Sequence, residues 1–206
     1  MWSWINFCID LVAQNPGWAL TIAFAGAIIE AVAVIGILVP GTPILMAVTG
    51  AAAMSGQSML PFLVLAIIGA VIGDFVSYWV GHRYRGRLWS TWPFSRHPDL
   101  MTKANRFFRR YGTPSVALCR FIPVLRSTVP LVAGMAGMQR RRFFVAIALS
   151  ALVWAPAHVY PAQFAGLSVE RLREGDWQTA ALWAGALLLC TAAGWLLHRI
   201  VLSRVG

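Results

Sequence analysis

The sequence predicts an all-α integral membrane protein. Its composition, its charge distribution and the prolines and charges inside its apolar segments are the three observations that predict this class. The 206 residues are 59% hydrophobic and only 12% charged, with a mean hydropathy of +0.68. A disordered chain needs low hydrophobicity, and a soluble domain usually has about a quarter of its residues charged. Both classes are therefore excluded, and the length suits one membrane domain.

The formal net charge of +10 is very unevenly distributed. Residues 1–82 contain no Lys or Arg, whereas residues 83–110 contain eight basic residues and one acid. Because basic loops beside membrane segments are usually cytoplasmic, we expect 83–112 in the cytoplasm. The same argument places 139–142, with its three arginines, and the C-terminus there. This topology accounts for the basic stretch without nucleic acid, which is not expected as a partner.

The elements follow from the N-terminus. Residues 1–19 lack the basic start of a signal peptide and carry three tryptophans, so we expect an interfacial helix there. Residues 61–81, 143–166 and 177–197 are long and apolar enough to span a bilayer. Pro156 and Pro161 are expected to interrupt the second of these helices. The mixed-charge loop that begins at 167 and precedes the last span is expected in the periplasm.

Two further apolar stretches do not fit simple spans. Residues 20–56 contain Glu30 and the breaker Pro40-Gly41-Thr42-Pro43, and residues 113–138 contain two arginines and three prolines. Each proline removes a helix hydrogen bond, and in lipid the freed group needs a partner from the protein or from a wet cavity.

The charges around these stretches predict how they enter the membrane. Residues 113–138 lie between two basic groups that we assign to the same side, so this segment must enter and leave on that side. Residues 20–56 would then form a re-entrant hairpin from the opposite face. Opposed hairpins indicate an inverted repeat around a midplane site. A weak sequence match supports this, because Glu30, Gly36 and Pro40 share their spacing with Arg120, Arg126 and Pro130.

Four ionisable residues lie within apolar segments, at an insertion cost of roughly 2.5–3.5 kcal/mol each. They are Glu30, Asp74, Arg120 and Arg126. One interpretation is a scaffold of ion pairs that only holds the hairpins together. The other is a polar cavity in which the two arginines bind an anionic headgroup, because a guanidinium matches phosphate oxygens in pairs. Glu30 would then be a protonatable group.

Asp74 belongs to the pattern Gly69-x-x-x-Gly73-Asp74-x-x-x-Tyr78, in which Asp74 and Tyr78 share one helix face. The glycines are expected to allow another helix to approach closely. Asp74 either pairs with an arginine of the second hairpin or contacts substrate. The chain has no metal-ligand spacing, nucleophile–base order or phosphate loop, so we expect neither a metal nor an enzyme.

These residues and their spacing resemble the DedA family, the bacterial branch of the VTT-domain superfamily. The resemblance covers residues 20–166 and is carried by three blocks of residues. These are Glu30…Gly36…Pro40-Gly41, Gly73-Asp74-x-x-x-Tyr78-x-x-Gly81, and Arg120-Phe121-Ile122-Pro123-x-x-Arg126…Pro130-x-x-Ala133-Gly134.

The resemblance implies opposed re-entrant hairpins and lipid translocation in the bacterial inner membrane. It implies undecaprenyl phosphate, or a phospholipid such as phosphatidylethanolamine, as the lipid partner, with protons or another cation as the only coupling species. The family's essential acid falls on Glu30 and its essential arginine pair on Arg120 and Arg126. Many members have a second acid where this chain has Thr42, so the coupling or the lipid can differ here.

The leading function is therefore inward translocation of an anionic lipid, with Asp74, Tyr78 and Thr42 supporting the polar site. The hairpin geometry is assigned to Pro40, Gly41, Pro123, Pro130 and Gly134. The alternatives are an uncoupled phospholipid scramblase and a scaffold without transport. The oligomeric state is not predicted.

Overall fold

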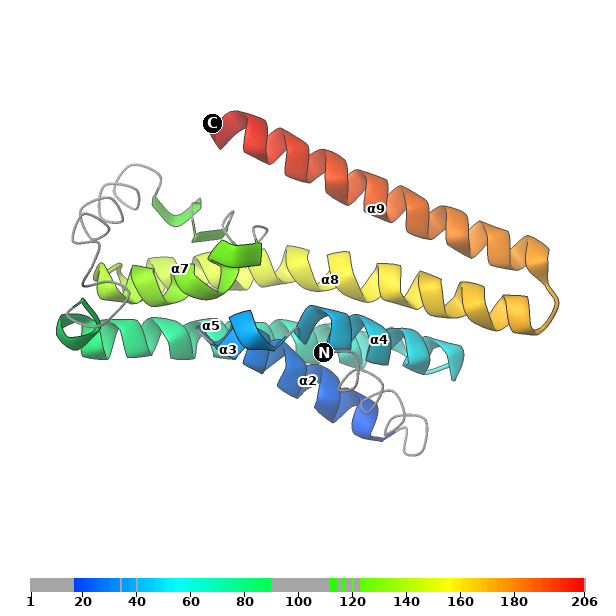
Figure 1. Cartoon of the computed structure of the whole chain (residues 1–206), viewed down its shortest axis with the longest axis horizontal. Coiled ribbons are helices and arrows are strands. Elements are labelled where there is room, and N and C mark those ends of the chain that lie inside the picture. The colour runs from blue at the N-terminus through cyan, green and yellow to red at the C-terminus, as the bar shows by residue number, and fades with distance from the viewer. Residues whose placement is uncertain are drawn as a thin grey trace. The chain divides into compact units, whose positions relative to one another are not determined.

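The computed structural model is helical throughout the part of the chain that it describes, and the all-α prediction is confirmed there. The described residues are 17–33, 35–39, 41–89, 112–114, 116–117, 120 and 123–205. They form seven helices and no strand (Figure 1). The helices are α2 (Trp18–Ala31), α3 (Ile35–Leu38), α4 (Gly41–Met54), α5 (Met59–Trp89), α7 (Pro123–Met135), α8 (Arg140–Arg173) and α9 (Trp177–Val205).

The chain forms two compact units. The first consists of Met1–Ala27, Gly41–Ile68 and Trp154–Gly206, and the second of Ile28–Pro40 and Gly69–Val153. Both long helices, α5 and α8, contribute residues to each unit.

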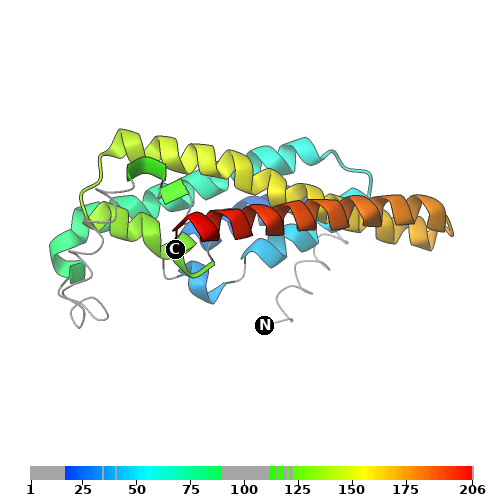
Figure 2. The same ribbon diagram turned by 90° about the horizontal axis from the view of Figure 1, so that it is seen from above.

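In the first unit the chain reverses direction between α2 and α4 (Figure 1). The two arms lie in van der Waals contact, because a Cβ on Gly26 would be 3.8 Å from the carbonyl oxygen of Gly41. After α8 the chain turns back, as Figure 2 shows from above, and the stacked rings of Phe164 and Trp183 join α8 to α9 with centroids 5.6 Å apart. This unit therefore contains a helical hairpin and the pair α8–α9.

In the second unit α7 packs directly onto α5 through glycines. A Cβ added to Gly81 would overlap the carbonyl oxygen of Leu131, and one added to Gly134 would overlap that of Tyr78. Such close approach of backbones is typical of membrane helix pairs with small residues at the contact. The core beside this crossing consists of Tyr78, Val116, Ala133, Phe143, Ala146 and Ile147.

Three helices end in the same left-handed turn. Gly56, Gly137 and Gly175 have φ values of 70°, 72° and 81°. At Gly137 the amides of Gly137 and Met138 donate to the carbonyls of Gly134 and Ala133, at 3.0 Å each. This pair of bonds is the Schellman motif, and glycine is preferred at its left-handed position. The motif ends α4, α7 and α8, so the second arm of each predicted hairpin stops in the same way.

Within the described residues, two helices are long and apolar enough to cross a membrane, Met59–Leu88 within α5 and Arg140–Arg173. Large apolar side chains repeat every four residues along one side of α5 and are exposed, as at Leu60, Val64 and Ile68. A continuous exposed apolar stripe of this kind suits contact with lipid. The predicted spans 61–81 and 143–166 thus correspond to longer helices.

Three further predictions concern the prolines of the second span, the last span and the N-terminal helix. The prolines at 156 and 161 do not interrupt the helix, because α8 continues through both. Residues 177–197 lie within α9, and a transmembrane role for that helix stays a prediction. The predicted interfacial helix at 1–19 lies outside the described residues, except for its last residues, where α2 begins at Trp18.

Candidate functional site

The candidate site starts where α2 is interrupted. α2 ends at Ala31 and α3 begins at Ile35. The β-branched residues at 32, 34 and 35 lower helix propensity, and Pro40 further on cannot donate the hydrogen bond that a continuing helix would need. The break places Glu30 in the last turn of α2, next to backbone groups that no longer pair within a helix.

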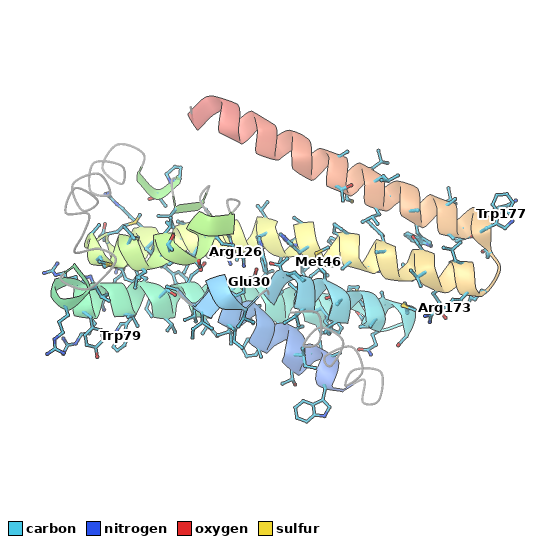
Figure 3. All side chains as sticks on the ribbon, in the orientation of Figure 1. Glu30, Met46, Trp79, Arg126, Arg173 and Trp177 are labelled. Carbon is cyan, nitrogen blue, oxygen red and sulfur yellow. The ribbon has the colours of Figure 1, made fainter. Side chains whose placement is uncertain are left out.

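Glu30 forms an ion pair with Arg126, which lies on α7 in the second predicted hairpin. The Arg126 Nη1 lies 3.0 Å from the Glu30 Oε1, and both side chains are nearly buried. Figure 3 labels the two residues, whose side chains meet between α2 and α7. The short helix α3 also contacts α7. The interruption of α2 therefore faces the arginine-bearing helix.

The second pair joins Arg120 to Asp74. The Arg120 Nη1 donates to the Asp74 Oδ2, and both residues are buried, with 6% and 4% of their surface exposed. Asp74 comes from α5, whereas Arg120 comes from the turn that precedes α7. Two acids and two arginines thus form a cluster without formal net charge. Such compensation is required because an isolated charge buried in an apolar medium is very costly.

Ser77, which the sequence interpretation did not single out, joins α5 to the break in α2. Its Oγ accepts a hydrogen bond from the amide of Ala33 at 2.8 Å and lies 3.2 Å from the carbonyl oxygen of Ala31. The same hydroxyl is 3.0 Å from the carbonyl oxygen of Gly73 in its own helix. Serine is common in membrane helices, so Ser77 does not stand out by its type. The only signal in the sequence is its spacing of four residues from Gly73, which places both on one helix face.

Ser127 follows Arg126 and was also missed. It is buried, and its Oγ has no hydrogen-bond partner among the described residues. Buried hydroxyls are usually paired, so Ser127 is an exception among the described residues of α7.

Tyr78 lies on the helix face predicted for it but bonds away from the ion pairs. Its hydroxyl donates to the carbonyl oxygen of Met138, in the turn between α7 and α8. Its ring stacks on Phe143 of α8 with centroids 4.3 Å apart. Tyr78 therefore ties α5 to the end of the second predicted hairpin.

The residues predicted to shape the hairpins lie at helix ends and crossings. Pro123 begins α7, where a missing amide hydrogen costs nothing, and Pro130 is inside that helix. Gly134 allows α7 to approach α5, and Gly41 begins α4. Pro40 lies outside the described residues. Thr42 lies in the first turn of α4, in the first unit.

Four ionisable residues predicted from the sequence, Glu30, Asp74, Arg120 and Arg126, all belong to the second unit, where they form two ion pairs. Among the residues that the structure describes, no group of three or more His, Cys, Asp or Glu side chains could hold a metal ion. The two ion pairs supply carboxylate and guanidinium groups to the site.

Comparison with known proteins places the chain in a family. The VTT domain profile matches residues 39–164, more than half of the chain. The inner membrane protein YabI of Escherichia coli K12 is 30% identical over 199 residues, which cover 92% of this chain and 75% of that relative. The chain belongs to the DedA family.

Other DedA-family relatives agree. Protein DedA of Escherichia coli K12 is 29% identical over 161 residues, covering 76% of this chain and 73% of its own. An uncharacterized membrane protein of Mycobacterium tuberculosis (strain CDC 1551 / Oshkosh) is 30% identical over 166 residues, covering 78% and 73%. No solved structure matches significantly. The resemblance inferred from the motifs is confirmed, and this DedA-family chain is a membrane protein.

Proposed function

We propose that this membrane protein translocates a lipid with an anionic phosphate headgroup, with undecaprenyl phosphate as the leading substrate. The observation that carries the proposal is the buried cluster in which Arg120 and Arg126 are each held by a carboxylate. A guanidinium binds a phosphate with the same two-point geometry that it uses for a carboxylate. An entering headgroup can therefore take over the arginines by exchanging one partner for another.

The exchange also gives a reason for coupling to protons. When phosphate takes Arg126, Glu30 loses its partner, and a buried unpaired carboxylate is costly. Uptake of a proton removes that charge. Loss of the proton on the other side of the membrane would return Glu30 to Arg126 and release the lipid. Because Thr42 cannot carry a proton in this way, we assign coupling to Glu30 alone.

The proposed architecture is that of two opposed re-entrant hairpins in the bacterial inner membrane. The reversal between α2 and α4, the interruption of α2 beside Glu30, and the matching ends of α4 and α7 support it. Irregular backbone at membrane depth is tolerated where protein surrounds it. The acyl chains would stay in the bilayer, since a chain of this size cannot enclose a long polyprenyl tail.

The test is transport in proteoliposomes with a leaflet-specific readout of undecaprenyl phosphate, with and without a pH gradient. We expect gradient-driven transport that Arg126→Gln abolishes. That variant removes the ion-pair partner of Glu30 and leaves a buried charge, which can impair folding. The double variant Glu30→Gln/Arg126→Gln removes both charges of the pair and is also expected to be inactive. The matched control is Arg171→Gln, which breaks an ion pair with Glu174 whose side chains are 45% and 50% exposed.

The other outcomes decide between the remaining functions. Transport of several phospholipids without dependence on the gradient would indicate an uncoupled scramblase. Absence of transport by folded protein, with Arg120→Lys tolerated in cells, would indicate a scaffold. Catalysis is the weakest alternative, because fixed ion pairs do not activate a nucleophile.

A further inference from the structure

The break in α2 leaves two main-chain groups that a continuous helix would have paired. In an uninterrupted helix the amide of Ala33 would donate to Ile29, and the carbonyl of Ala31 would accept from Ile35. In the structure both groups instead meet the hydroxyl of Ser77 on α5. Main-chain groups are costly to leave unpaired in the membrane, because lipid chains form no hydrogen bonds. The Ser77 hydroxyl therefore pairs with one main-chain donor and one main-chain acceptor.

Close packing brings this hydroxyl within reach. A Cβ on Gly73 would lie 2.5 Å from the carbonyl oxygen of Ile28 and 2.6 Å from the Cβ of Ala31, so α2 lies directly on α5 there. Gly73 and Ser77 are four residues apart and share one face of α5. Ser77 is 2% exposed, so its hydroxyl is buried where α2 and α5 meet.

The two helices that Ser77 joins carry the two acids of the cluster. Glu30 immediately precedes Ala31, and Asp74 lies three residues before Ser77 on the same helix. The hydroxyl has a single hydrogen, which the carbonyls of Ala31 and Gly73 share. The donated hydrogen can therefore alternate between the two helices, whereas the bond that Ser77 accepts from the amide of Ala33, at 2.8 Å, keeps α2 on α5.

We propose that Ser77 is a positioning residue of the phosphate site, which sets the distance between the Glu30–Arg126 and Asp74–Arg120 pairs by holding the broken end of α2 on α5. The proposal rests on the proposed lipid transport. Ser77 does not touch the headgroup; it acts through Glu30. Its loss should therefore weaken lipid capture more than it slows movement of captured lipid.

The test compares Ser77→Ala with Ser150→Ala. Ser150 is a buried serine of α8 in the same unit, and its hydroxyl donates within its own helix, to the carbonyl oxygen of Ile147 at 3.0 Å. The transport rate is measured against the concentration of undecaprenyl phosphate in proteoliposomes. For Ser77→Ala the half-saturating concentration should rise about fivefold, the factor that one ordinary hydrogen bond represents. The maximal rate should stay within about twofold, and Ser150→Ala should match the wild type.

Hydrogen exchange of the peptide containing residues 28–36 provides a readout that does not depend on lipid. Exchange should accelerate in Ser77→Ala and not in Ser150→Ala. If Ser77→Ala does not fold, Ser77→Cys keeps the volume with a weaker hydrogen bond and should show both effects to a smaller degree.

The outcomes separate this proposal from the one on which it rests. If the wild type transports lipid and Ser77→Ala behaves like Ser150→Ala in both assays, Ser77 has no positioning role and the proposed function stands. A lower maximal rate with unchanged half-saturation would also overturn the positioning role. If the wild type transports no lipid, both proposals fall, whatever the exchange rates are.

Discussion

At the scale of single residues, close contact between backbones makes some glycines irreplaceable. Gly73→Ala should lower the free energy of unfolding by about 1–3 kcal/mol, the usual range for an overpacked core. The added methyl would collide with Ile28 and Ala31 of α2. Unfolding of the purified protein in detergent, followed by circular dichroism, measures the change.

Gly86→Ala is the matched control on the same helix. A Cβ at Gly86 would meet nothing within 4 Å, and alanine has the higher helix propensity. This variant should be as stable as the wild type or more so. Equal loss of stability in both variants would show that α2 does not lie on α5 at Gly73.

The charged residues of the site could be predicted individually, whereas their pairing could not. Glu30, Asp74, Arg120 and Arg126 stand out because each is an ionisable residue within an apolar stretch. Which arginine meets which acid depends on how three helices cross, and no local pattern specifies that. Ser77 was missed for the same reason, since its partners are backbone groups of a distant helix.

At the scale of secondary-structure elements, helix ends are well specified by local sequence. Asp176 immediately precedes α9, and its Oδ1 accepts a hydrogen bond from the amide of Thr179 at 3.1 Å. This is a typical N-cap. Hydrogen bonds from the side chain and then the backbone of Thr179 hold the pKa of the Asp176 carboxyl below its ordinary value.

The lowered pKa of Asp176 determines how the stability of the first turn of α9 changes with pH. The stabilisation by this cap is complete above the ordinary aspartate pKa of about 3.9 and is lost as the pH falls through the lower value in the folded state. The first turn of α9 should therefore fray in strong acid. Asp176→Asn keeps a capping oxygen and should remove this pH dependence.

Amide exchange at Thr179, corrected for the intrinsic effect of pH, measures the fraying. Asp176→Ala should exchange faster at every pH because it has no capping oxygen. Fraying of Asp176→Asn at the same pH as the wild type would contradict a cap that depends on charge.

The lengths of elements were less predictable than their ends. The breaker at Pro40-Gly41 correctly separated two helices, and the turns at Gly56 and Gly137 separate α4 and α7 from the long helices that follow. Pro156 and Pro161, however, did not end α8. In a packed membrane helix, neighbouring groups can compensate for a lost hydrogen bond, so tertiary context determines the outcome.

At the scale of the whole molecule, α8 determines the sidedness of the loops. Its 34 residues span about 51 Å at 1.5 Å per residue, well beyond the roughly 30 Å of a bilayer core. Its two ends should therefore emerge on opposite faces, with the arginines at 140–142 in the cytoplasm and Glu174 outside.

Cysteine labelling in whole cells tests this topology in a variant without the three native cysteines. Arg141→Cys and Arg87→Cys should react only after the membrane is made permeable, whereas Glu174→Cys should react with an impermeant reagent in intact cells. Labelling of all three from outside would rule out the topology and the opposed hairpins derived from it.

The order of charges along the chain has a consequence for biogenesis. Glu30 and Asp74 precede Arg120 and Arg126, so a ribosome delivers both acids to the membrane before either base exists. At about 5–20 residues per second, Glu30 waits roughly 5–20 s for Arg126. During that interval the nascent protein carries both carboxyl groups in the insertion machinery without their arginine partners. The ion pairs can form only after the second predicted hairpin has been synthesised.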